Sequence, residues 1–211
     1  MSGGIVILIS GRGSNMRAIL EQAKAGEIPA PVSIVISNNA AADGLVTARS
    51  FGVPIEVVPH RNFPTRDAFD TELMRAIDRH RPKLVVLAGF MRILSDTFID
   101  HYKNRLINIH PSLLPAFPGL NTHQRAIDAK AKQHGATVHF VTLDVDAGPI
   151  IAQVKVPVLP NDTPTSLNDR VLKEEHRILP LVVKWFVEDR LSIQDGRVLL
   201  DGSISREQGL S

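Results

Sequence analysis

Short apolar runs alternate with segments of helical spacing in the first half of the chain, and this pattern constrains the fold most. Runs rich in Val, Ile and Leu are typical of strands buried on both faces of a parallel sheet. Strands that alternate with helices predict an α/β fold with a Rossmann-like, doubly wound and mostly parallel sheet. The predicted strands are residues 5–10, 32–37, 55–58, 84–89 and 106–110, and the predicted helices lie near residues 15–25, 41–51 and 66–79.

The second half of the chain changes character after a proline-rich stretch. A helix is predicted near residues 123–133, and two extended segments follow, residues 135–148 and 149–160. The "DAGP" turn between these segments predicts an antiparallel C-terminal hairpin. A longer helix is expected over about residues 164–188, although Pro180 should kink it or split it in two.

The domain organisation is expected to be simple. No repeat, low-complexity tract or linker interrupts the 211 residues, so one domain, 1–211, is predicted. A change of pattern near residue 103 is interpreted as a boundary between two lobes, residues 1–102 and 103–211. Short extended pieces around residues 197–200 should end the second lobe.

Composition excludes several classes of protein. The chain carries 24 Lys and Arg against 22 Asp and Glu with no block of like charge, which offers little to a nucleic acid. It contains no cysteine, which excludes disulfides, thiolate metal sites and cysteine nucleophiles. No basic region precedes the first apolar run, and no run approaches the roughly 18 apolar residues of a membrane span. We therefore expect a cytoplasmic protein with small-molecule substrates, no nucleic acid and no membrane.

The stretch "ISGRGSN", residues 9–15, joins a predicted buried strand to a helix. Gly11 and Gly13 permit a tight backbone turn, and Ser14 or Asn15 can cap the helix. The N–H groups and the dipole of the helix would then favour an anion such as phosphate. The stretch completes neither the P-loop pattern nor the dinucleotide fingerprint, and it also suits a plain glycine-rich turn.

The stretch "LINIHPS" ends a predicted strand with polar residues. Strand alternation places Asn108 and His110 on one face, and Pro111 ends the pairing. An amide and an imidazole then lie side by side at the carboxyl end of a strand, where open α/β sheets form their crevices. Such a pair suits a site that handles a carbonyl oxygen, because both groups donate and a histidinium can transfer a proton. A histidine at a strand end also serves structural roles.

The stretch "TLDVDAGPI" carries two carboxylates. Asp144 and Asp146 alternate with apolar residues, so both should point one way if the strand runs that far. A carboxylate against His110 would favour the charged imidazolium and fix its orientation. Asp and Gly are also standard turn residues, so the stretch could equally be a plain turn.

The other histidines carry weaker signals. His139 falls inside an apolar strand and is expected to be a satisfied core histidine. No pair has the spacing of metal ligands with an acidic third ligand, so no metal is expected. The histidines expected to be solvated are His60, His80, His101 and His134.

Over residues 5–200, the chain resembles the phosphoribosylglycinamide formyltransferase family. Its members are folate-dependent enzymes of purine synthesis. The Asn-x-His-Pro-Ser-Leu-Leu-Pro segment is specific to folate formyltransferases and their hydrolase relatives. The stretches that carry the resemblance are "SGRGSN", "VVLAGFMRILS", "LINIHPSLLPAFPGL", "THQRAI", "TVHFVTLDVDAGPII" and "EEHRILPLVV".

The resemblance implies a reaction and roles for three residues. A formyl group would pass from the cosubstrate 10-formyltetrahydrofolate to the amine of glycinamide ribonucleotide (GAR), giving formyl-GAR and tetrahydrofolate without a metal. Asn108 and protonated His110 would stabilise the oxyanion, and Asp146 would keep His110 charged and help to carry protons. The first lobe would bind phosphate, and the second would bind folate and hold the catalytic residues.

The resemblance also implies the residues that bind each substrate. Asn121 stands where some relatives have histidine, and Leu172 stands where others have a polar or basic phosphate contact, so Lys173 could matter more here. The implied GAR-binding residues are Gly13, Ser14, Asn15 and Glu175. The implied folate-binding residues are Arg66, Met91, Arg92, Ile93, Leu94, Asn108, Val141 and Asp144.

Several alternatives stay open. Methionyl-tRNA formyltransferase and formyltetrahydrofolate hydrolase use the same Asn, His and Asp with another acceptor. Both usually carry an extra domain, for which 211 residues leave no room, and the nearly balanced charge does not favour tRNA. A non-catalytic module that binds folate or a nucleotide could use the same fold. Both a monomer and a homodimer fit the sequence.

Overall fold

The computed structural model describes residues 3–204, so the ends of the predicted domain, residues 1–2 and 205–211, lie outside the described residues. The chain divides into two compact units, Met1–Ile107 and Asn108–Ser211. Seven strands form one sheet in the order β3-β2-β1-β4-β5-β6-β7, and three short strands form a second sheet in the order β10-β9-β8. The predicted α/β fold, a mostly parallel sheet with an antiparallel hairpin, is confirmed.

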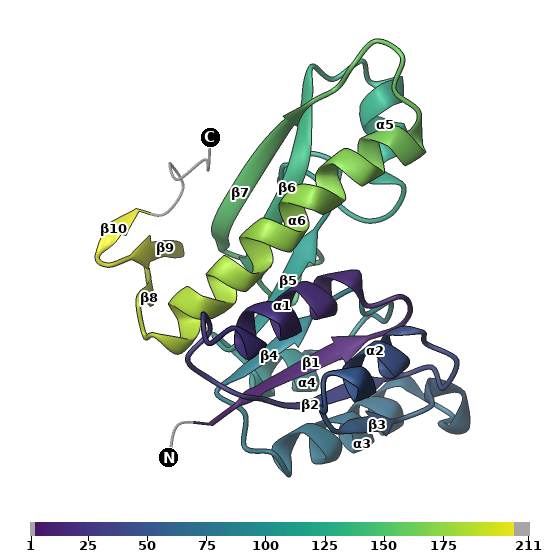
Figure 1. Cartoon of the computed structure of the whole chain (residues 1–211), viewed down its shortest axis with the longest axis vertical. Helices are drawn as coiled ribbons and strands as arrows, with labels where there is room; N and C mark the ends of the chain where they lie inside the picture. The colour runs from purple at the N-terminus through teal and green to yellow at the C-terminus, as the bar shows by residue number, and fades with distance from the viewer. Residues whose placement is uncertain (1–2, 205–211) are drawn as a thin grey trace. The chain divides into compact units, whose positions relative to one another are not determined.

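The first unit shows the predicted alternation of strands and helices (Figure 1). β1 pairs in parallel with both β2 and β4, and its five residues, Ile5–Ile9, have no exposed surface. This burial explains why the strand is apolar on both faces. The elements of the unit are β1 (Ile5–Ile9), α1 (Ser14–Lys24), β2 (Val32–Ser37), α2 (Gly44–Ser50), β3 (Ile55–Val57), the 3-10 helix η1 (His60–Asn62), α3 (Arg66–Asp78), β4 (Leu84–Leu87) and α4 (Asp96–His101).

The second unit contains the hairpin of β6 and β7, which is antiparallel. The long helix α6 packs on both strands of the hairpin (Figure 1). None of the helices within residues 3–204 has the length and apolar character that a membrane crossing requires. The elements are the end of β5 (Leu106–His110), α5 (Thr122–Asp128), β6 (Gln133–Phe140), β7 (Ile150–Pro157), α6 (Pro164–Val187), β8 (Leu191–Gln194), β9 (Arg197–Leu200) and β10 (Ser203–Ile204).

The structure corrects three details of the predicted second half. The helix predicted to reach residue 133 ends at Asp128, because Lys130 takes a φ of 51° and β6 begins soon afterwards. The predicted split of α6 is wrong, since the helix continues through Pro180, which is buried. The unpredicted strand β8 pairs with β9 across Asp195 and Gly196, whose φ values of 48° and 72° suit a two-residue hairpin turn.

Candidate active site

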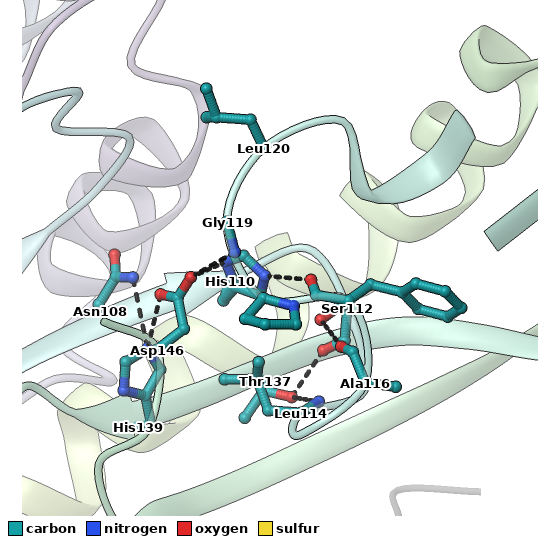
Figure 2. A network of polar contacts seen from close by, with 12 residues as sticks. Asn108, His110, Ser112, Leu114, Ala116, Gly119, Leu120, Thr137, His139 and Asp146 are labelled. Carbon is teal, nitrogen blue, oxygen red and sulfur yellow. Dashed lines mark hydrogen bonds and ion pairs between the residues drawn. The ribbon is translucent and has the colours of Figure 1, made fainter. Parts of the chain in front are cut away.

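Polar residues of the second unit gather around His110, at the end of β5 (Figure 2). The His110 side chain is 7% exposed, and its Nδ1 lies 3.3 Å from Oδ2 of Asp146. Its Nε2 lies 3.0 Å from the carbonyl oxygen of Phe117. Because a carbonyl can only accept, Nε2 donates to Phe117, and the other ring nitrogen faces a carboxylate. The ring is therefore held between two acceptors, as an imidazolium requires.

Asp146 approaches His110 from a loop and not from a strand. β6 ends at Phe140, and Asp146 takes the left-handed conformation with a φ of 54°. The prediction that Asp144 and Asp146 point the same way from a strand is therefore wrong, and Asp144 is exposed. The backbone N–H of Gly119 donates to Oδ2 of Asp146 at 2.8 Å. The carboxylate thus faces the ring and also accepts from a backbone amide.

His139 completes the cluster, a role that the sequence reading missed. It is 2% exposed in β6, as expected of a core histidine, and its Nδ1 donates to the carbonyl oxygen of Phe140 at 2.9 Å. Its Nε2 is then left as an acceptor and lies 3.4 Å from Nδ2 of Asn108. Burial lowers the pKa of His139, which keeps the ring neutral. The one signal in the sequence was an ionisable residue inside an apolar strand.

The proline-rich loop after β5 is fixed by the buried side chain of Thr137, on β6 (Figure 2). Thr137 Oγ1 donates to the carbonyl oxygen of Ser112 at 2.6 Å and accepts from the backbone N–H of Leu114 at 3.1 Å. Gln153 Nε2 also donates to this hydroxyl, at 2.9 Å. Ser112 Oγ donates to the carbonyl oxygen of Ala116 at 2.7 Å. These bonds fix residues 112–116, directly before the residues of the loop that contact His110 and Asp146.

In the first unit, the glycine-rich turn ends at Gly13, which takes a φ of 69° and occupies the cap position of α1. A Cβ atom there would lie 3.0 Å from Cα of Gly44, so only glycine fits without strain. The expected capping by Ser14 or Asn15 is wrong, because both residues lie inside the helix and no side chain caps it. No side chain at the cap position therefore accepts a hydrogen bond from the backbone N–H groups in the first turn of this 11-residue helix.

Residues 91–94 of the first unit form an irregular segment held at both ends. Ser10 Oγ accepts from the backbone N–H of Met91 at 2.7 Å, and Oδ2 of the buried Asp70 accepts from that of Ser95 at 2.5 Å. The side chains of Met91 and Ile93 are 68% and 67% exposed. The segment thus presents apolar side chains from a fixed backbone. Of the other predicted folate residues in this unit, Leu94 is buried and Arg66 and Arg92 are exposed.

The remaining predicted residues lie in varied surroundings. Glu175 is 7% exposed on α6, and Val141 is half-buried just after β6. The prediction that His134 is solvated is wrong, because its side chain has no exposed surface inside β6. Its Nε2 lies 3.2 Å from Nδ1 of His123, and burial lowers the pKa of His134 to about 4. Among the other histidines predicted to be solvated, the side chain of His101 is 42% exposed, and His60 and His80 are half-buried.

The cluster in the second unit suits one kind of chemistry. Asn108 has an amide N–H beyond the one that faces His139, His110 lies between two acceptors, and the carboxylate of Asp146 faces the imidazole ring. These groups can stabilise negative charge on a carbonyl oxygen and move a proton nearby. Across residues 3–204, no group of three or more His, Cys, Asp or Glu side chains is placed to hold a metal ion.

Comparison with known proteins gives a consistent result. The model of the family described as formyl transferase matches residues 4–183. The chain is 47% identical to the phosphoribosylglycinamide formyltransferase of Escherichia coli over 97% of both chains. It is similar to the solved phosphoribosylglycinamide formyltransferase of Coxiella burnetii, with 46% identity and a TM-score of 0.92 over 97% of this chain and 96% of that one. A formyltetrahydrofolate deformylase of Pseudomonas syringae is 28% identical, with a TM-score of 0.88 over 95% of this chain and 66% of that one. The chain therefore belongs to the formyl transferase family.

Proposed function

We propose that this protein is a phosphoribosylglycinamide formyltransferase of purine (IMP) biosynthesis. It transfers the formyl group of 10-formyltetrahydrofolate to the amine of GAR and releases formyl-GAR and tetrahydrofolate. The observation that carries the proposal is the cluster of Asn108, His110 and Asp146, because it combines an amide donor, an imidazole between two acceptors and a carboxylate. The 47% identity to the Escherichia coli enzyme supports GAR as the acceptor.

The cluster has a defined part in each step of the transfer. The GAR amine attacks the formyl carbon and forms the new C–N bond, which places negative charge on the formyl oxygen. An amide N–H of Asn108 and the positive charge of His110 stabilise this oxyanion. Asp146 receives the proton that the amine loses, directly or through water, and a proton reaches N10 of the folate as its bond to the formyl carbon breaks. No step requires a metal.

The acceptor is bound largely through its phosphate. In this proposal the phosphate lies on the backbone of Gly13, Ser14 and Asn15, because the first turn of α1 is not closed by a capping side chain and its dipole favours an anion. Glu175 contacts the ribose or the amine of GAR. Lys173 is exposed on α6 and supplies the positive charge that some relatives place at Leu172.

The folate is bound by the fixed segment of residues 91–94. Its pterin ring lies against the exposed apolar side chains of Met91 and Ile93, beside Arg92 and Leu94. A contact of this kind removes apolar surface from water on both partners. The other residues proposed to bind the folate are Asn108, Val141 and Asp144, with Arg66 contributing a positive charge. The proposal assigns phosphate binding to residues 1–102, which also hold Arg66 and the apolar segment 91–94, and it assigns catalysis and the other folate contacts to residues 103–211.

The setting follows from the small substrates. We expect the protein to work in the cytoplasm as a monomer or a homodimer, without a nucleic acid or a membrane. The second candidate activity is hydrolysis of 10-formyltetrahydrofolate, favoured by the likeness to the Pseudomonas syringae deformylase. Water would then replace the GAR amine at the same cluster. A module that only binds folate or a nucleotide would have no need for His110 between two acceptors.

A spectrophotometric assay of tetrahydrofolate release distinguishes the formyltransferase, the hydrolase and the binding module. The purified protein is mixed with 10-formyltetrahydrofolate, with and without GAR, and compared with the His110→Ala variant. A matched control is His101→Ala, which removes a histidine whose side chain is 42% exposed and lies outside the cluster. We expect product only with GAR, a loss of about 10²- to 10⁴-fold for His110→Ala, and an unchanged control. Equal consumption of the donor without GAR would show a hydrolase, and no reaction in either mixture would leave the binding module.

A further inference from the structure

Residues 117–119 contact both members of the His110 and Asp146 pair through their backbone. The carbonyl oxygen of Phe117 accepts from Nε2 of His110 at 3.0 Å, and the N–H of Gly119 donates to Oδ2 of Asp146 at 2.8 Å (Figure 2). An acceptor on the ring and a donor on the carboxylate each favour the charged form of their partner. The segment therefore stabilises the ion pair from both sides.

The backbone conformation of residues 117–119 needs support from neighbouring contacts. Phe117 takes a φ of 54°, in the left-handed region that non-glycine residues rarely adopt, and Gly119 takes a φ of 77°. Such a conformation persists only where neighbouring contacts enforce it. Pro118, inside the segment, and Leu120, which follows it, are both exposed, so packing of these two side chains does not supply those contacts.

Arg125 supplies such contacts from helix α5, beside the edge-to-face contact of the Phe117 ring with His134 at 5.9 Å between centroids. Its guanidinium donates to the carbonyl oxygens of Pro118 and Leu120, the second at 3.4 Å. Its Cζ also lies 5.7 Å from the centroid of the Phe117 ring, over its face. A planar guanidinium can donate along fixed directions and stack on a ring at once, which an ammonium cannot do. One cation therefore touches Phe117 and the residues on either side of Gly119.

We propose that Arg125 is a positioning residue for formyl transfer, which fixes residues 117–119 so that Phe117 and Gly119 hold His110 and Asp146 in their charged, reactive arrangement. This inference rests on the proposed function, because it assigns the purpose of the arrangement. Arg125 itself is exposed and contacts backbone carbonyls, so its effect is on geometry and not on the global fold. Small displacements of catalytic groups reduce rates strongly even where stability hardly changes.

The experiment compares steady-state kinetics of the wild type, Arg125→Ala, Arg125→Lys and Gln124→Ala, with GAR and 10-formyltetrahydrofolate varied in turn. Gln124 is the matched control, because it is the preceding residue of α5 and is exposed. Its Nε2 donates to Oδ1 of Asp128 at 2.7 Å, on the same helix. We expect kcat to fall about tenfold or more in both Arg125 variants, with KM for either substrate changed less than twofold. Gln124→Ala should keep the wild-type kcat.

The pH dependence of kcat gives a readout that a purely structural role would not move. If Arg125 sets the contacts of His110 and Asp146, which His139 also faces at 3.7 Å from Oδ1 of Asp146, the shape of the pH profile should change in both Arg125 variants. The Tm of each protein is also measured. If Arg125→Ala has a lower Tm than the wild type, Arg125→Lys, which keeps the charge and the aliphatic stem, is the variant that tests the positioning role.

The outcomes separate the two proposals. A wild type that does not formylate GAR overturns the proposed function, whatever the variants do. An active wild type together with Arg125 variants that keep the wild-type kcat and the wild-type pH profile overturns the positioning role alone. A rise in KM at unchanged kcat would also overturn it, because Arg125 would then be a substrate-binding residue.

Discussion

The amide nitrogen Nδ2 of Asn108 lies 3.4 Å from Nε2 of His139, and the other ring nitrogen of His139 donates to the carbonyl oxygen of Phe140. The backbone carbonyl decides which nitrogen carries the proton, so His139 can only accept from Asn108. The amide is thereby oriented with its NH₂ group toward the ring, and its second N–H remains to serve a substrate oxygen. His139 thus orients the amide to which the proposed function assigns the stabilisation of the oxyanion.

We predict that His139→Phe lowers kcat by about 10- to 100-fold, because Asn108 loses the acceptor that orients it. Phe fills most of the buried volume, so the protein should still fold. His139→Gln is the matched variant, since its side-chain oxygen can still accept, and it should lose less activity. Steady-state kinetics with both substrates, alongside circular dichroism, measures the effect. A folded His139→Phe protein with full kcat would show that Asn108 needs no such partner.

The sequence was sufficient for the parts of the fold that residue type controls. β2 and β5 have the bounds that their apolar runs predict, because strands buried on both faces must be apolar throughout. The position of Asn108 beside His110 follows from the alternation of side chains along β5. The start of α3 also follows from residue type, because Thr65 favours the cap position and its side chain accepts from the N–H of Ala68 in the first turn of the helix.

The parts of the site that residue type does not control were out of reach. Asp146 lies in a loop with a left-handed φ, and no periodicity describes such a loop. Phe117 and Gly119 contribute a carbonyl and an N–H, which every residue except proline offers, so no letter in the sequence marks them. His139 looked like a core residue, and it is one; only the approach of Asn108 shows its second role.

We predict that Gly148→Ala disturbs the loop that carries Asp146. A Cβ atom at Gly148 would clash with the carbonyl oxygen of Phe140, so the backbone must move where β6 ends. Because Asp146 is two residues away, activity should fall at least tenfold. The control is Ala147→Ser, which adds one atom at the exposed neighbouring position and should behave as wild type. Equal activity of the two variants would contradict the prediction.

We predict that Thr163→Ala destabilises helix α6. Thr163 Oγ1 accepts from the N–H of Ser166 at 3.1 Å, and Ser166 Oγ accepts from the N–H of Thr163 at 3.0 Å, which forms a reciprocal cap. Loss of such a cap costs about 1 kcal/mol, which corresponds to about 2–4 °C in Tm for a chain of this size. Thr163→Ser keeps the hydroxyl and should melt with the wild type. Calorimetry decides, and equal Tm values for all three proteins would mean that the cap contributes nothing.

We predict that His134 makes the protein lose stability as the pH falls from 6.5 to about 4. Burial lowers the pKa of His134 to about 4, with the neighbouring His123 as the next cause, whereas an unfolded histidine titrates near 6.5. Between these two pH values His134 is protonated in the unfolded chain but not in the folded protein, so the free energy of unfolding rises with pH. At about 1.4 kcal/mol for each pKa unit, the loss at low pH is about 3 kcal/mol.

His134→Gln tests this through urea unfolding at a series of pH values. The variant loses the contact with Nδ1 of His123 and should be less stable at neutral pH, but its stability should fall less steeply below pH 6.5. Part of the slope should remain, because burial also lowers the pKa of His123. His101→Gln, at a partly exposed site, should keep the full slope. If His134→Gln keeps it too, the acid sensitivity arises at another group, since a side chain without a titratable proton cannot contribute to the difference in bound protons between the folded and unfolded states.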